Sequence, residues 1–108
     1  GNADAAQGAG VNLAARGRHV EARPYFEQAA QGGNIGGVVN FALCLIRGEG
    51  GPTDPERACR LLEGVAPESR TSRLCRLLAR CYREGMGVPA DPARARALEA
   101  QGTQLEGR

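Results

Sequence analysis

Apolar residues recur along this chain at spacings of three and four positions, which is typical of helices that bury one face. The clearest stretch holds Leu74, Leu77, Leu78, Cys81 and Tyr82. No stretch alternates between apolar and polar residues as a half-buried strand would, so we expect an all-α fold. The pattern predicts six helices, at about residues 4–15, 19–31, 35–47, 55–65, 70–84 and 92–103.

The chain repeats part of itself at an offset of 37 residues. Residues 42–61 match residues 79–98 at ten of twenty positions. A period of roughly 30 to 50 residues is typical of solenoids, whose helical units stack along one axis. The identical positions are Ala42/Ala79, Cys44/Cys81, Gly48/Gly85, Gly50/Gly87, Pro52/Pro89, Asp54/Asp91, Pro55/Pro92, Arg57/Arg94, Ala58/Ala95 and Leu61/Leu98.

Each copy contains the signals that end one helix and begin another. Gly85 supplies the left-handed residue that closes a helix, and Gly87 permits a second unusual backbone angle in the connection. Asp91 is suited to cap the next helix, and Pro92 is suited to its first position, where no N–H donor is needed. The pattern therefore predicts a helix, a glycine-rich turn and a second helix.

A third copy lies upstream, where Ala22 stands 36 residues before Ala58. Its turn lacks the Gly-x-Gly and Asp-Pro signals of the other two copies. Three units are about the minimum at which stacking buries a continuous core. We therefore expect three helical hairpins in a single repeat domain over residues 1–108. The repeats are expected at about residues 3–33, 34–68 and 69–105.

Residues 78–82 and 85–95 (LARCY and GMGVPADPARA) resemble the Sel1-like repeat family. That family's pattern is Leu-Gly-x-x-Tyr-x-x-Gly-x-Gly-Val, two residues, Asp, and then Lys-Ala or Arg-Ala. Ala79 replaces the Gly of the family pattern. In the second repeat, Leu45 stands in place of the Tyr and Gly51 in place of the Val. The first repeat resembles the related tetratricopeptide repeat. The resemblance implies a right-handed α-solenoid that acts as an adaptor or scaffold.

In solenoids of this kind, the first helix of each hairpin lines a concave groove. Relative to Ala79, the resemblance places groove side chains six and three residues earlier and one and four residues later. These positions are Arg73, Arg76, Arg80 and Arg83 in the third repeat, Gly36, Val39, Leu43 and Ile46 in the second, and Asp4, Gln7, Val11 and Ala14 in the first. The predicted partner-binding residues are Val39, Leu43, Ile46, Arg73, Arg76, Arg80 and Arg83.

We call Arg73, Arg76, Arg80 and Arg83 the Arg stripe, because spacings of three and four place them on one helical face. The hypothesis is that the groove binds an extended or helical peptide. This peptide would be apolar in its centre and acidic, or end in a carboxylate, near the Arg stripe, because guanidinium groups suit planar acidic groups.

Two alternatives to this binding site remain open. The Arg stripe would be a solvated, salt-bridged face if internal carboxylates neutralise it. The candidate internal partners are Glu84, Glu99 and Glu49. The apolar residues Val39, Leu43 and Ile46 would instead be additional core or a face for self-association.

Composition narrows the classes of function. All fourteen basic residues are Arg, yet the net charge is only +2 and aromatic residues make up 4% of the chain. An RNA- or anion-binding module that uses the Arg stripe is therefore a less favoured alternative function, because basic residues without aromatic stacking partners do not favour nucleic-acid binding. The chain has one His and no phosphate-binding loop, so we expect neither an enzyme nor a cofactor. No stretch approaches the roughly 20 apolar residues that span a membrane.

The four cysteines and His19 do not have the spacing of a metal site. Free cysteine is among the most buried residue types, so we expect Cys44, Cys59, Cys75 and Cys81 to be small core residues. The expected helix of Cys59 packs between the helices of Cys44 and Cys81. One disulfide, from Cys59 to either of them, is therefore an alternative in an oxidising compartment.

The chain begins at Gly1 rather than Met, so we expect it to be an excised part of a longer protein. A purely structural segment of a longer solenoid is therefore an alternative function. The sequence does not distinguish a cytoplasmic location from a periplasmic or secreted one. We expect a monomer or weak self-association, and the partner is an unidentified protein or an acidic and apolar peptide.

Overall fold

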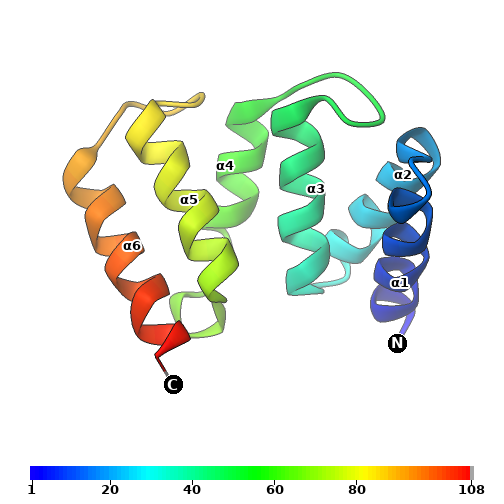
Figure 1. Cartoon of the computed structure of the whole chain (residues 1–108), viewed down its shortest axis with the longest axis horizontal. Coiled ribbons are helices and arrows are strands. Elements are labelled where there is room, and N and C mark those ends of the chain that lie inside the picture. Colours follow the sequence, from blue (N-terminus) through cyan, green and yellow to red (C-terminus); the bar gives the residue numbers. More distant parts are fainter. Residues whose placement is uncertain (108) are drawn as a thin grey trace. The chain divides into compact units, whose positions relative to one another are not determined.

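The computed structural model describes residues 1–107, and these form six α-helices, one short 3-10 helix and no strand (Figure 1). The predicted all-α class and the six helices are therefore confirmed. The 3-10 helix η1 was not expected. The elements are α1 (Asn2–Ala15), α2 (His19–Gln31), α3 (Ile35–Arg47), α4 (Pro55–Glu63), η1 (Pro67–Ser69), α5 (Ser72–Glu84) and α6 (Pro92–Glu106).

The helix ends follow the capping residues in the sequence. The Asn34 side chain accepts a hydrogen bond from the Gly37 N–H at 2.8 Å and begins α3. The side chain of Thr71 caps α5 in the same way, and that of Asp91 caps α6. The prediction for residues 70–84 began two residues early, because η1 precedes the true cap at Thr71. The last helix continues to Glu106, three residues past its predicted end.

Residues 1–107 divide into two compact units. Unit 1 is Gly1–Asp54 and contains α1, α2 and α3. Unit 2 starts at Pro55 and contains α4, η1, α5 and α6. The boundary falls inside the second predicted repeat, between its two helices. The single domain and the right-handed course of the whole solenoid stay predictions.

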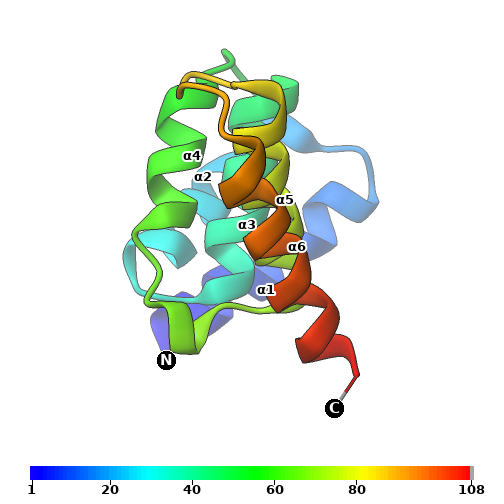
Figure 2. The ribbon, with the colours of Figure 1, turned by 90° about the vertical axis from the view of Figure 1, so that its left-hand side faces the viewer.

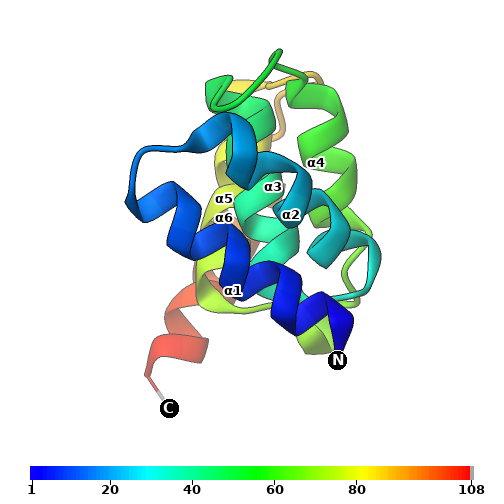
Figure 3. The same cartoon turned by 90° about the vertical axis from the view of Figure 1, so that its right-hand side faces the viewer.

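Unit 1 packs its helices through small residues. Helices α1 and α2 lie side by side (Figure 3). A Cβ added at Gly10 of α1 would lie 2.7 Å from the Phe26 ring of α2. Similarly, a Cβ at Gly37 of α3 would lie 2.5 Å from that of Ala29. The absence of side chains at these two positions therefore sets how closely α2 meets its neighbours.

Unit 2 has an apolar core built mainly by α5. Leu74, Leu78 and Cys81 of α5 are fully buried. Helix α6 runs antiparallel beside α5 and buries Ala95 and Leu98 (Figures 1 and 2). These two residues are three positions apart, which places them on one face of α6.

The glycine-rich turn makes the same tertiary contact in both units. Gly50 has φ +75°, and a Cβ there would lie 2.3 Å from the carbonyl oxygen of His19. Gly87 has φ +72°, and a Cβ there would lie 2.5 Å from the Cα of Glu56. His19 and Glu56 are themselves 37 residues apart and begin α2 and α4. Each turn thus lies directly on the first turn of the preceding second helix.

Gly87→Ala should destabilise the chain by at least about 2 kcal/mol, because the left-handed backbone disfavours a Cβ and the Glu56 backbone leaves no space for one. Gly64→Ala is the matched control, since its added Cβ would meet neighbours only at 3.4 Å or more. Urea unfolding followed by circular dichroism measures both. Equal stability of the two variants would show that the close approach does not constrain the fold.

Cys59 of α4 and Cys81 of α5 form a disulfide. Both residues are buried, and the bridge joins helices that share few other contacts. Of the two partners that the sequence left open for Cys59, the structure selects Cys81. Cys44 and Cys75 are buried free thiols, as the prediction of core residues required. Burial raises the pKa of both thiols, so they stay protonated and unreactive at neutral pH.

Removing this bridge with Cys59→Ala should lower the free energy of unfolding by about 3 kcal/mol under oxidising conditions, from the entropy of a 22-residue loop. A reducing agent should destabilise the wild type and leave the variant unchanged. Thermal unfolding with and without dithiothreitol measures this difference. An unchanged wild-type melting temperature in dithiothreitol would contradict the prediction.

Candidate partner-binding site

The predicted site residues lie on the first helices of two hairpins, in different units. Val39, Leu43 and Ile46 lie on α3 of unit 1. The Arg stripe lies on α5 of unit 2.

In unit 1, the apolar half offers less surface than expected. Val39 is only 2% exposed and belongs to the interior. Leu43 and Ile46 are half-buried and keep part of their surface accessible. On α1, Val11 is 46% exposed. Among the predicted groove positions on α1 and α3, Leu43, Ile46 and Val11 are thus the larger apolar side chains that keep accessible surface.

Polar contacts join α1 to the start of α3. Asn34 Nδ2 donates to Asp4 Oδ1 at 2.7 Å. The Gln7 side chain lies against Gly36, where an added Cβ would be 2.9 Å from Gln7 Nε2. Gln7 Oε1 is buried, and no hydrogen-bond donor reaches it within residues 1–107.

In unit 2, carboxylates of the same unit pair with the Arg stripe. Arg80 Nε lies 2.7 Å from Glu84 Oε2, one helical turn further along α5. Arg83 pairs with Glu99 of α6, and Arg76 pairs with Glu106 near the end of α6. The side chains of Arg76, Arg80 and Arg83 keep 59%, 41% and 55% of their surface exposed.

Two of the three expected internal partners, Glu84 and Glu99, therefore occupy the predicted role. Glu49, the third expected partner, lies 3.9 Å from Arg47 and 3.8 Å from His19 within unit 1. The true third partner, Glu106, was missed because the predicted helix ended at residue 103. It could have been found from its spacing, since Glu99 and Glu106 are seven residues apart and share one helical face.

The two units differ in charge. Unit 1 carries four Arg and five carboxylates, whereas the chain from Pro55 onward carries ten Arg and seven carboxylates. The side-chain net charges are thus −1 and +3. The excess of positive charge is therefore confined to the half of the chain that holds the Arg stripe.

Sequence reasoning missed a polar cluster around Glu63, the last residue of α4. Glu63 Oε1 accepts hydrogen bonds from the Tyr82 hydroxyl and from Arg94 Nη2, the latter at 2.6 Å. Glu63 Oε2 accepts from Arg70 Nη2 at 3.0 Å. The Arg94 guanidinium also stands 5.0 Å from the centre of the Tyr82 ring. One carboxylate therefore joins α4, α5 and α6.

Arg70 is the buried cation of this cluster, with 9% of its surface exposed. Besides Glu63 Oε2, it donates to the carbonyl oxygens of Glu63 at 3.1 Å and Val65 at 3.0 Å. These bonds compensate the loss of water around its charge. Tyr82 and Arg94 are both positions of the repeat pattern, and that was the signal that could have placed them together.

The cluster shifts the pKa values of Glu63, Tyr82 and Arg94, and the hydrogen bond to Glu63 raises that of Arg94 above its usual value. Partial burial raises the pKa of Glu63, but hydrogen bonds from Tyr82 and Arg94 and the charges of Arg94 and Arg70 lower it more, so it lies below its usual 4.5. The hydrogen bond to Glu63, together with burial, raises the pKa of Tyr82 above its usual 10.0. None of these groups titrates near neutral pH, so the cluster is suited to holding helices together rather than to proton transfer.

Glu63→Gln should lower the free energy of unfolding at neutral pH by about 1–3 kcal/mol, because a charged acceptor of several hydrogen bonds is lost. The folded pKa of Glu63 is depressed, so its contribution is complete above the unfolded value of 4.5 and is lost as the pH falls through the folded pKa. Urea unfolding at about pH 7 and about pH 3 measures the difference.

The matched control is Glu68→Gln in η1, which removes a carboxylate of the same unit that lies outside the cluster. This control should change stability little at either pH. A Glu63→Gln deficit that persists in full at the lower pH would contradict the role of the ionised carboxylate.

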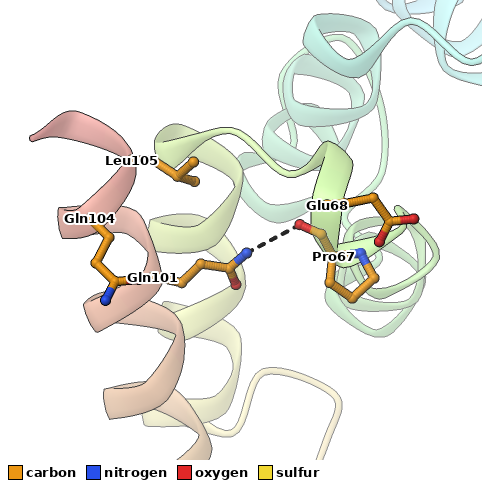
Figure 4. Close-up of a pocket in the computed structure, with 5 residues that line it drawn as sticks. All are labelled: Pro67, Glu68, Gln101, Gln104 and Leu105. Atoms are coloured by element: carbon orange, nitrogen blue, oxygen red, sulfur yellow. Dashed lines mark hydrogen bonds between the residues drawn. The ribbon is translucent and has the colours of Figure 1, made fainter. Parts of the chain in front are cut away.

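A shallow hollow of about 280 Å³ lies between η1 and the second half of α6 (Figure 4). Gln101 Nε2 donates across it to the Pro67 carbonyl oxygen at 3.1 Å. The lining residues are Pro67, Glu68, Gln101, Gln104 and Leu105. A single carboxylate and two amides provide hydrogen bonding but no acid–base pair or nucleophile.

Residues 1–107 contain neither a metal-binding cluster nor a membrane-spanning helix. No group of three His, Cys, Asp or Glu side chains there is arranged to hold a metal ion. None of the helices in that range is both long and apolar enough to cross a membrane.

Comparison with known proteins identifies the repeat. The family model described as Sel1 repeat matches residues 19–34, 39–63 and 72–98, which together are more than half of the chain. No curated protein matched the chain. The predicted resemblance is therefore confirmed by the family model.

Two solved structures have the same fold. A Sel1 repeat protein from Oxalobacter formigenes superimposes with a TM-score of 0.79 over 95% of this chain, at 25% identity. A protective antigen present in uropathogenic Escherichia coli strains, which displays an SLR fold, gives a TM-score of 0.83 over 99% of this chain, at 24% identity. The match covers 44% and 25% of those two chains, so this chain spans less than half the length of either. Both likenesses support an α-solenoid of helical hairpins.

Proposed function

We propose that this chain, which belongs to the Sel1 repeat family, binds an acidic segment of a partner protein through the exposed face of α5. Sel1 repeat proteins are generally non-catalytic scaffolds for protein interactions, and no enzyme family matches this chain. The choice of α5 and of an acidic partner is the part that goes beyond the family.

The observation that carries this proposal is the exposure of the ion pairs along α5. Arg76, Arg80 and Arg83 share one face, and each pairs with a carboxylate that is itself 41–48% exposed. Exposed ion pairs contribute only about 0–1 kcal/mol each. A carboxylate of a partner can therefore replace an internal carboxylate at small cost, and bidentate guanidinium geometry favours that exchange.

Unit 1 supports apolar binding on its own first helices. Leu43 and Ile46 of α3 are half-buried, and Val11 of α1 is 46% exposed. Partly accessible aliphatic side chains are suited to bury apolar side chains of a partner. We do not include Val39 in the proposed surface, because it is interior.

Charge reversal of Arg76→Glu with Arg80→Glu should abolish binding of the acidic partner, because each change replaces attraction by repulsion. The measurement is affinity capture with the full-length protein from its native source, comparing wild type and variant by quantitative mass spectrometry. The proposal expects at least one acidic protein that the wild type retains and the variant loses.

The matched control reverses Arg18→Glu with Arg60→Glu. Both are exposed Arg residues whose ion pairs lie within three or four residues, at 2.6 Å and 2.7 Å, and neither lies on α5. This control changes net charge by the same amount and should retain the partner. Equal loss in both double variants, or in neither, would overturn a specific site on α5.

A second candidate function is a structural segment of a longer solenoid. It is favoured by the lengths of the two solved structures, of which this chain matches 44% and 25%. Further copies at 36–37 residues in the full-length chain, together with partner binding that persists in the Arg76→Glu, Arg80→Glu variant, would favour this function.

A further inference from the structure

Two of the ion pairs on α5 form a ladder with α6. Arg76 and Arg83 are seven residues apart, which is two helical turns, so they share one face of α5. Glu106 and Glu99 are likewise seven residues apart on α6, which runs antiparallel beside α5 (Figure 1). Arg76 pairs with Glu106, and Arg83 pairs with Glu99. The chain thus contains a helix with two spaced carboxylates, docked on the Arg stripe.

This ladder is not what holds α6 in place. Helix α6 attaches to α5 through Ala95, Leu98 and Gly102, which are buried. In contrast, both side chains of each ion pair are exposed, at 59% and 41% for Arg76 and Glu106 and at 55% and 44% for Arg83 and Glu99. Such pairs add little to stability, so Glu99 and Glu106 can leave Arg83 and Arg76 while the apolar contacts stay intact.

The spacing of the ladder selects a helical ligand. Seven residues of helix span about 10.5 Å and return a side chain to the same face. An extended peptide covers that distance in about three residues, but side chains three apart on a strand point to opposite sides. Carboxylates that reach both Arg76 and Arg83 from one face are therefore best presented by a helix.

We infer that the Arg stripe recognises a partner helix with acidic side chains seven residues apart, and that Glu99 and Glu106 compete with it as an internal substitute. This inference rests on the proposed function of α5 and adds the secondary structure and spacing of the ligand. It also adds a regulation, because the internal carboxylates lower the affinity for every acidic partner.

The inference predicts that removing two carboxylates tightens binding. Glu99→Gln with Glu106→Gln leaves Arg76 and Arg83 without their internal partners. If each exposed pair contributes about 0.5 kcal/mol, the dissociation constant of an acidic helix should fall about fivefold. The matched control is Glu56→Gln with Glu68→Gln, which makes the same change in net charge on α4 and η1.

The probe is a synthetic helical peptide of Ala and Gln with three Glu residues spaced by seven. A second peptide of identical composition spaces them by five, which places them on different faces. Binding is followed at low ionic strength by the Nε–Hε signals of Arg76 and Arg83 in the 15N-labelled chain. The seven-spaced peptide should shift both signals and bind more tightly than the five-spaced one. Its affinity should rise with Glu99→Gln, Glu106→Gln but not with the control Glu56→Gln, Glu68→Gln.

Equal affinity for the two peptides would overturn the helical spacing. Equal gains in the Glu99→Gln, Glu106→Gln variant and its control would overturn the competition. Glu106→Gln alone, in the last turn of α6, provides a second variant in case the double change perturbs the fold, and it should give a smaller gain. If Arg76→Glu, Arg80→Glu abolishes peptide binding, but the two peptides bind equally and the carboxylate variants do not differ, this inference is overturned and the proposed function is not. Unchanged binding in that charge reversal would instead overturn the proposed function.

Discussion

The close approach of a glycine turn to the preceding helix is the constraint on which the rest of the structure depends. Gly50 lies against the His19 carbonyl, and Gly87 lies against the backbone of Glu56, both at the first turn of a second helix. A side chain at either position would meet backbone atoms, which cannot move aside as a flexible side chain can. The same contact at an offset of 37 residues fixes how α3 is placed against the start of α2 in unit 1, and how α5 is placed against the start of α4 in unit 2.

Two stronger ties then hold unit 2 around α4. The Cys59–Cys81 disulfide joins α4 to α5, and Glu63 at the end of α4 accepts hydrogen bonds from α5, α6 and the buried Arg70. These ties matter because α4 is the shortest α-helix among residues 1–107 and shares few other contacts with α5. Because these buried groups hold the helices of unit 2 together, the exposed ion pairs of α5 are not needed for its stability. This separation is what makes the Arg stripe suitable for exchange with a partner's carboxylates.

Much of the fold could be predicted from the sequence because its signals are local. The ends of α2 and α3 follow from apolar periodicity and from caps such as Asn34, which act within one helical turn. The candidate site was predictable only in part. The Arg stripe and its partners Glu84 and Glu99 follow from spacing. The pairing of Glu106 with Arg76 could not be predicted without knowing how far α6 extends. Val39 was placed on a binding surface by its register, and packing placed it in the interior instead.

The sequence by itself determined the repeat, the all-α class, the caps and the face on which four Arg residues gather, because each depends on neighbours within a few residues or on the 37-residue period. Only the tertiary structure decided that Cys59 bonds Cys81, that Tyr82, Arg94 and Arg70 meet on Glu63, and that α6 brings Glu99 and Glu106 to the Arg stripe. These pairs are separated by up to 31 residues, and their geometry depends on how helices pack. Helix packing is set by the shape of buried side chains, which the periodicity of a sequence does not contain.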